Sequence, residues 1–252
     1  MNESPDNLER LNLHWREQLG IAPDDLRVGE LRILSWPKRK EDLCWWAFRR
    51  RGRAILSVRE DLLDEAIATF AQVPVPELFS DANRARMKAI ADAHGKALYD
   101  DFGPVLYVDE EHFLPAAGTE DCRALGPSEG HLMENWPQEA YEEWILTELR
   151  ADYAKQPLEN RFWVRMEGEV PAAVAWMEVQ TQQAWEVGVG THRDYRRRGY
   201  GRAVVSAATK ATLDRGLLVV YTTAWTNIAS QRLARGLGYI PYGEQVCIEY
   251  AK

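Results

Sequence analysis

The chain has 252 residues, of which 46% are hydrophobic and 28% charged, and its formal net charge is −8. This composition indicates a folded globular protein with one large domain or two modest ones. The net negative charge argues against non-specific nucleic-acid binding, which needs a basic surface, and the longest apolar runs are far too short to span a membrane. We therefore expect neither a nucleic acid nor a membrane as partner.

Three cysteines, Cys44, Cys122 and Cys247, are widely separated and odd in number. Their spacing indicates neither a disulfide framework nor a metal site, so we expect buried thiols and no metal. The first six residues are charged and contain no apolar core region, so no signal peptide is expected. These features favour a reducing, cytoplasmic location.

The first 117 residues predict a small α+β domain of undefined role. The expected elements are a polar helix over 5–19, strands over 31–36, 43–49 and 54–58, a helix around 62–70, a helix over 82–100, and a strand over 104–108. The arginine-rich stretch 49–52 lies between the second and third strands. Because it has a single glycine and joins two strands, we interpret it as a charged hairpin turn.

Proline, glycine and small residues over 114–121 predict a linker, which divides the chain into domains 1–117 and 118–252. The second domain predicts a mixed α+β sheet. Its expected elements are a helix over 138–155, strands over 162–166, 172–180 and 184–190, a helix over 202–215, a strand over 217–224, a short helix from 227 ended by Gly238, and a strand over 245–250.

The run Arg196-Arg197-Arg198-Gly199-Tyr200-Gly201 connects a predicted strand to a predicted helix. A helix start presents unpaired backbone N–H groups and the positive end of the helix dipole, and both favour an anion. Two glycines allow a phosphate to approach the backbone, and three arginines add charge. The stretch therefore predicts a site for a phosphate-bearing cofactor.

Two stretches in the right order, 187–201 and 227–239, resemble the motifs of the GNAT superfamily of acyl-CoA N-acyltransferases. The second runs from Asn227 through Leu233 to Leu237-Gly238-Tyr239. The resemblance covers about residues 118–252 and implies the GNAT fold for that part. The N-terminal domain is compatible with a degenerate relative of the same fold, and it could also shape the acceptor pocket.

The resemblance implies acetyl-CoA as the acyl donor. The backbone amides of 197–202 would then hold the pyrophosphate, the strand edge at 187–189 would pair with the pantetheine arm, and the Val189 amide would polarise the thioester carbonyl. Asn227 would contact the pantetheine, or simply cap its helix. The residues expected at the cofactor are Val187, Val189, Arg196, Arg197, Arg198, Gly199, Tyr200, Gly201, Arg202, Asn227 and Ser230.

The expected reaction is direct attack of a neutral primary amine on the thioester in a ternary complex. Only about one alkyl amine in 10³ is neutral at pH 7, so a base is useful. Glu186 is our candidate base and Glu178 the alternative, although a solvated or ion-paired carboxylate also fits Glu186.

Many relatives carry a tyrosine as general acid at the position of Ala234. This departure leaves the usual proton donor undefined. Tyr195, Tyr200 or Tyr221 could replace it, whereas Tyr239 is expected in the core.

A module that binds acyl-CoA without turnover, as a sensor or interaction partner, is the alternative to an enzyme. The acceptor is expected to be a small molecule or peptide amine held by residues 128–150. The sequence of this stretch does not indicate which amine it is. Either a monomer or a homodimer is compatible with the sequence.

Overall fold

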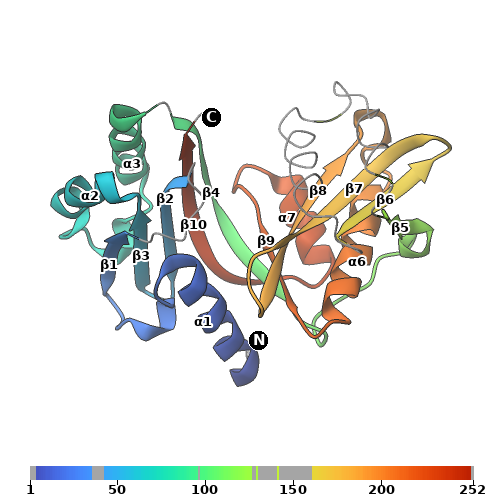
Figure 1. Cartoon of the computed structure of the whole chain (residues 1–252), viewed down its shortest axis with the longest axis horizontal. Helices are drawn as coiled ribbons and strands as arrows, with labels where there is room; N and C mark the ends of the chain where they lie inside the picture. The colour runs from blue at the N-terminus through green and yellow to red at the C-terminus, as the bar shows by residue number, and fades with distance from the viewer. Residues whose placement is uncertain are drawn as a thin grey trace.

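The computed structural model describes residues 4–35, 43–95, 97–126, 129, 141 and 161–250. Ten strands among these residues form one mixed sheet in the order β1-β3-β2-β10-β4-β9-β8-β7-β6-β5 (Figure 1). The pairs β1–β3 and β8–β9 are parallel, and the other pairs are antiparallel. The mixed α+β fold class that the sequence predicts is confirmed.

The N-terminal part supplies strands at one end of the sheet. Its elements are α1 (Pro5–Leu19), β1 (Leu31–Ser35), β2 (Leu43–Arg50), β3 (Arg53–Val58), α2 (Leu63–Phe70), α3 (Asp81–His94) and β4 (Ala97–Val108). Local signals fix several of these ends. Gly20 ends α1 in the left-handed conformation with φ 86°, and the Ser80 side chain accepts a hydrogen bond from the Asn83 amide at the start of α3.

The C-terminal part supplies the other end of the sheet and the helices that cover it. Its elements are β5 (Cys122–Ala124), β6 (Phe162–Glu167), β7 (Val170–Val179), β8 (Ala184–Thr191), α6 (Tyr200–Leu213), β9 (Leu218–Thr222), α7 (Ile228–Gly236) and β10 (Ile240–Tyr250). Gly238, with φ 89°, follows α7 in the left-handed conformation, as the sequence predicts.

Two expectations about element bounds are wrong. The helix expected over 82–100 ends at His94, and β4 begins at Ala97, because Gly95 ends the helix. The last strand begins at Ile240 rather than at 245. The helix expected over 138–155 lies outside the described residues, apart from Tyr141.

The sheet passes without a break between the two predicted domains. β10, the last strand of the chain, pairs with both β2 and β4, and β4 pairs with β9 (Figure 1). A division into 1–117 and 118–252 stays a prediction, but any such domains share their central strands.

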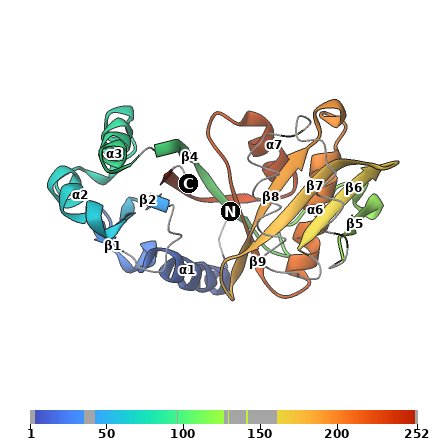
Figure 2. The same ribbon diagram turned by 45° about the horizontal axis from the view of Figure 1, so that its top comes forward.

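The helices cover the two faces of the sheet differently. α1 packs on one face across both parts, where Leu11 and Trp15 join side chains from β4, β8 and β9 in one cluster. On the other face two separate clusters form, one under α2 and α3 and one under α6 and α7. Phe102 contacts the first and Leu106 belongs to the second, from the same side of β4, because alternate residues of a strand share a face. Figure 2 shows α2 and α3 on one side of β4 and α6 and α7 on the other.

In the described part of the chain, no helix combines the length and the apolar character needed to cross a membrane.

Candidate functional site

Strand β8 has one open edge along its second half. Its pairing with β7 runs from Trp185 to Thr191, whereas its parallel pairing with β9 covers only Ala184 to Glu186. The two strands therefore separate after the Glu186–Val220 pair. Alternate residues of an antiparallel strand direct their N–H and C=O groups away from the partner, so β8 presents unpaired backbone groups at this opening.

A turn with several unpaired amides follows β8. A short 3₁₀ turn, Arg193–Tyr195, leads to Arg197 with φ 64°, to Gly199 with φ 84°, and then to α6. Within the described residues, the amides of 197–202 donate to no backbone acceptor, and the first helical bond is donated by the Ala203 amide to the Gly199 carbonyl at 3.0 Å. The turn and the helix start thus supply consecutive donors suited to an anion.

The two glycines of this turn serve different purposes. Gly199 has open space around its Cα and is required by its positive φ, which other residues rarely adopt. A Cβ on Gly201 would lie 2.7 Å from Thr191 Oγ1 and also close to Leu233 and Val189. Gly201 therefore lets the start of α6 approach β8 closely, a contact that the sequence does not predict.

The arginine side chains around the turn make separate contacts. Arg196 Nε donates to the Thr191 carbonyl at 3.3 Å, and the Arg198 guanidinium lies 5.1 Å from the centre of the Tyr195 ring. Arg202 donates to the Gly236 carbonyl at the end of α7. The Arg202 side chain thus ties α6 to α7, which leaves its amide for the proposed site.

Asn227 and Ser230 lie at the start of α7, beside β9. Asn227 Oδ1 accepts from the Ser230 amide at 3.1 Å, which is the helix-cap role considered for it. Ser230 Oγ is 2.8 Å from the Tyr221 hydroxyl. Burial raises the pKa of Tyr221 to about 12, so the phenol stays protonated at neutral pH.

The Glu186 carboxylate is held on both sides at the point where β8 and β9 separate. Thr222 Oγ1 on β9 donates to Oε1, and Gln180 Nε2 donates to Oε2 at 2.5 Å. Glu178 lies directly opposite Glu186 in the β7–β8 pair, so both carboxylates share a face of the sheet. Sequence reasoning missed Thr222 and Gln180, because the parallel register that places Thr222 beside Glu186 leaves no local signal.

The candidate proton donors occupy different surroundings. Ala234 is fully buried in the cluster under α6 and α7, and Tyr239 is buried with its hydroxyl 2.6 Å from Thr209 Oγ1, so the expectation of a core Tyr239 is confirmed. Tyr200 hydrogen-bonds to Glu167, which raises the pKa of the phenol. Tyr195 packs edge-on against His192. Of the three tyrosines, Tyr221 is the one joined to α7.

Within a mixed α+β sheet, the open edge of β8 is followed directly by a turn whose backbone amides are suited to an anion. Residues 128–239 match the model of the acetyltransferase (GNAT) family. Both sequence motifs, 187–201 and 227–239, lie within this matched stretch, so the similarity to the GNAT family that they indicate is confirmed.

Solved structures with this type of fold resemble the chain only distantly. An acetyltransferase from the GNAT family of Colwellia psychrerythraea is 14% identical over 66% of this chain and 62% of its own, with a TM-score of 0.47. A GCN5-related N-acetyltransferase from Kribbella flavida is 22% identical over 65% and 63%, with a TM-score of 0.47. A GCN5-related N-acetyltransferase from Sphaerobacter thermophilus is 15% identical over 77% and 71%, with a TM-score of 0.48.

The chain thus spans less than two thirds of the first two of these proteins. No curated protein matches it.

Proposed function

We propose that the protein is an acetyl-CoA-dependent N-acetyltransferase that transfers the acetyl group to a primary amine in a ternary complex. The observation that carries this proposal is the juxtaposition of an open β8 edge with the unpaired amides of residues 197–202. The match of residues 128–239 to the GNAT family model supports acyl transfer as the general activity.

The proposed cofactor site follows the chain from β8 to α6. The edge at Val187 to Val189 would pair with the pantetheine arm as an added strand does, and the amides of 197–202 would bind the pyrophosphate. Arg196, Arg197 and Arg198 add positive charge there. Ser230 and Asn227 would bound the pantetheine from α7.

Glu186 is the proposed general base. An amine acceptor has a pKa near 10.4, so it must lose a proton before it attacks the thioester carbonyl. The hydrogen bonds from Thr222 and Gln180 fix the Glu186 carboxylate at the strand opening. The Val189 amide, on the same strand, is the proposed donor to the developing oxyanion.

Tyr221 and Ser230 are the proposed hydrogen-bond donors toward the leaving thiolate, in place of a tyrosine at 234. Their hydroxyls are 2.8 Å apart, and Ser230 is the more exposed of the two. Because burial keeps Tyr221 protonated, its hydroxyl can donate a hydrogen bond to Ser230 while Ser230 donates one to the sulfur.

Calorimetric titration with acetyl-CoA and with CoA tests the cofactor site. We expect saturable binding of both, and no binding at millimolar cofactor would remove the proposal. A screen of amine acceptors with purified protein then identifies the substrate class.

Replacement of Glu186 by Gln tests the base. The variant keeps the hydrogen-bonding size of the side chain but cannot accept a proton, so we expect kcat to fall by roughly 10²–10⁴. Glu178→Gln on the same face tests the alternative base in the same assay. A Glu186→Gln rate within a factor of two of the original protein would show that this carboxylate is a bystander.

A binding module without turnover is the second candidate, and Ala234 favours it because a buried methyl group cannot donate a proton. Release of CoA thiol in the presence of an amine panel separates the two functions. Turnover above the hydrolysis background would exclude a pure binding role.

A cytoplasmic location belongs to the proposal. It is supported by the absence of disulfides, because Cys44, Cys122 and Cys247 all lie in the described part of the chain and none is bridged.

A further inference from the structure

Three polar side chains of α1 contact the β7–β8 turn, residues 180–183. Arg10, His14 and Gln18 follow each other at four-residue spacing, so they lie on one side of the helix. Each of them bonds to a residue of this turn, although the partners are 162 to 173 positions apart in the chain. The N-terminal part therefore holds a turn that directly precedes β8 and its Glu186.

Gln18 and His14 hold the first half of the β7–β8 turn. Gln18 Nε2 donates to the Gln180 carbonyl at 3.2 Å. His14 is fully buried, and its Nδ1 lies 2.9 Å from Thr181 Oγ1. The same oxygen accepts hydrogen bonds from the two amides of 183–184, both at 3.2 Å, so the chain reverses around it. Because a buried polar group that loses its partner is costly, these contacts fix the turn against α1.

Arg10 connects the end of the same turn to the start of β9. Its Nη2 donates to the Gly216 carbonyl at 2.5 Å and to the Gln183 carbonyl at 3.4 Å. The Gln183 carbonyl also accepts from the Leu218 amide at 3.0 Å, where β9 begins. α1 therefore holds β8 and β9 at the end where they pair in parallel, just before they separate.

The Gln180 side chain extends this anchorage to the Glu186 carboxylate. Its Nε2 donates to Glu186 Oε2 at 2.5 Å, and its backbone carbonyl is the acceptor for Gln18. Thr222 on β9 donates to the other carboxylate oxygen, and Glu178 is the charged neighbour directly opposite in β7. Both hydrogen-bond donors thus belong to segments that α1 holds in place.

We propose that Arg10, His14 and Gln18 are positioning residues for the Glu186 carboxylate, which makes the N-terminal part of the chain a component of the proposed active site. They act through the β7–β8 turn, and their role rests on the proposed function of Glu186 as the base. A hydrogen bond to a carboxylate favours its charged form and fixes its direction. Loss of the anchorage should therefore raise the pKa of Glu186 and lower kcat.

The pH profile of kcat/KM for full-length variants tests this role. Gln18→Ala removes the donor to the turn and retains the helix, since alanine is the best helix former. We expect kcat to fall by about threefold to tenfold, KM for acetyl-CoA to stay unchanged, and the acid limb of the profile to move to higher pH. Gln180→Met removes the donor to the carboxylate itself and should have the larger effect in the same direction.

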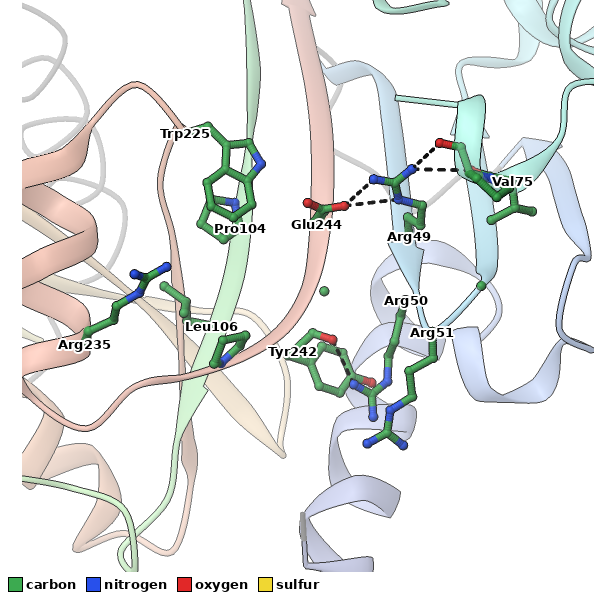
Figure 3. A pocket seen from close by; sticks show the side chains of 14 residues that line it. Arg49, Arg50, Arg51, Val75, Pro104, Leu106, Trp225, Arg235, Tyr242 and Glu244 are labelled. Atoms are coloured by element: carbon green, nitrogen blue, oxygen red, sulfur yellow. Dashed lines mark hydrogen bonds and ion pairs between the residues drawn. The ribbon is translucent and has the colours of Figure 1, made fainter. Parts of the chain in front are cut away.

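Two variants control for a general loss of stability. Arg16→Ala removes an exposed ion pair between the same helix and Asp25, with Nη2 and Oδ2 2.9 Å apart. Arg49→Gln removes the ion pair with Glu244, which joins β2 to β10 in a cleft on the face opposite α1 (Figure 3). Both should leave kcat and the acid limb unchanged, whatever their effect on the urea midpoint.

The double variant Gln18→Ala with Gln180→Met separates positioning from a general loosening of the fold. If α1 acts through Gln180, the double variant should have the same kcat and the same acid limb as Gln180→Met alone. Additive losses of kcat in the double variant, or an unchanged acid limb in Gln18→Ala, would overturn the proposal.

A titration of the Glu186 carboxyl group that needs no turnover distinguishes this inference from the proposed function. The readout is the carboxyl-carbon NMR resonance in isotopically labelled protein, assigned by its absence in Glu186→Gln. A higher pKa of Glu186 in Gln18→Ala, without acetyl transfer to any amine, would support the anchorage and reject the proposed function. An equal pKa in Gln18→Ala and the original protein would reject the anchorage, whether or not acetyl groups are transferred.

Discussion

Two arginine–glycine turns, one in each half of the chain, look alike in sequence and differ in structure. Residues 49–52 join β2 to β3, which pair with each other from Trp45 to Arg50. Residues 196–201 join β8 to α6, and no strand follows to take up their amides. The first is the hairpin turn that the sequence predicts, whereas the second leaves six amides without a backbone acceptor in the described residues.

The element that follows a turn decides what its backbone can bind. In the hairpin, Arg50 and Arg53 face each other across the strands, and both side chains lie within 4 Å of Asp24. In the second turn the backbone itself is the donor surface, and the side chain of Arg202 serves to hold α7. The same residue types therefore form a closed hairpin turn in one half of the chain and a turn with unpaired backbone amides in the other.

The largest expected effect tests whether the two halves are separable at all. A fragment of residues 118–252 lacks β4 and α1, so β9 loses its antiparallel partner and Leu218 and Val220 lose their cover. We expect this fragment to aggregate or to unfold without cooperativity. Size-exclusion chromatography and thermal melting of the fragment measure this.

The control is the full chain cut by limited proteolysis near residue 118, which should stay one particle under native conditions. A monomeric fragment with a sigmoidal melt would contradict the interdependence and favour two autonomous domains.

The next effect compares one glycine from each turn. Gly201→Ala places a methyl group 2.7 Å from Thr191 Oγ1, so α6 must shift away from β8, and we expect CoA affinity to fall by about 100-fold. Gly52→Ala, at φ 74°, should cost about 1–2 kcal/mol of stability and leave CoA affinity unchanged. Titration calorimetry and urea unfolding of both variants measure this contrast.

The double variant Gly201→Ala with Thr191→Ala tests the steric explanation for the loss of CoA affinity in Gly201→Ala. Removal of the Thr191 hydroxyl restores space for the new methyl group. Partial recovery of CoA binding is expected. Unchanged affinity of Gly201→Ala would show that the turn has been assigned to the wrong ligand.

A third effect concerns α1, the helix that both halves share. His14 is fully buried with Nδ1 2.9 Å from Thr181 Oγ1, and burial lowers its pKa to about 3. In the unfolded chain, His14 binds a proton with a pKa near 6.5. In the native state it binds this proton only near pH 3. The free energy of unfolding should therefore fall by about 1.4 kcal/mol for each pH unit between these values as the pH is lowered.

Urea unfolding of the original protein and of His14→Gln at pH 7 and pH 5 measures this, and we expect the variant to lose about 2 kcal/mol less over that interval. His94→Gln, at an exposed position of α3, is the control. An identical loss in both variants and the original protein would exclude His14 as the acid-sensitive link between the halves.

Features encoded within a few residues could be predicted from the sequence. The β2–β3 hairpin, the turn at 196–201 and the glycine after α7 each depend on local chemistry, and each appears in the structure where it was expected. Glu186 could be proposed from its place just before the turn. The two hydrogen bonds that hold its carboxylate could not, because they depend on how β8 meets β9.

Features that join distant segments could not be predicted from the sequence. The pairing of β10 with β2 connects residues about 200 positions apart, and no periodicity within either strand specifies its partner. The arginines of 49–52 were correctly predicted as a turn, but nothing local indicates what the turn faces.

The smallest expected effect arises from backbone strain, which is present in both turns. Arg51 and Arg197 are the two described non-glycine residues with positive φ, at 46° and 64°. Asparagine tolerates this conformation better, and Asn-Gly is the preferred pair for the two-residue β2–β3 loop, so Arg51→Asn should stabilise the fold by roughly 0.5–1 kcal/mol. Arg197→Asn should stabilise it by a similar amount but weaken CoA binding, because its charge lies at the proposed pyrophosphate site.

Urea midpoints and CoA titrations of the two variants separate strain from function. If the strain at 197 is maintained for ligand binding, stability and affinity move in opposite directions there, whereas Arg51→Asn changes stability alone. Loss of CoA affinity in Arg51→Asn, or none in Arg197→Asn, would reverse the roles assigned to the two turns. The hairpin turn would then be the one that contacts the cofactor.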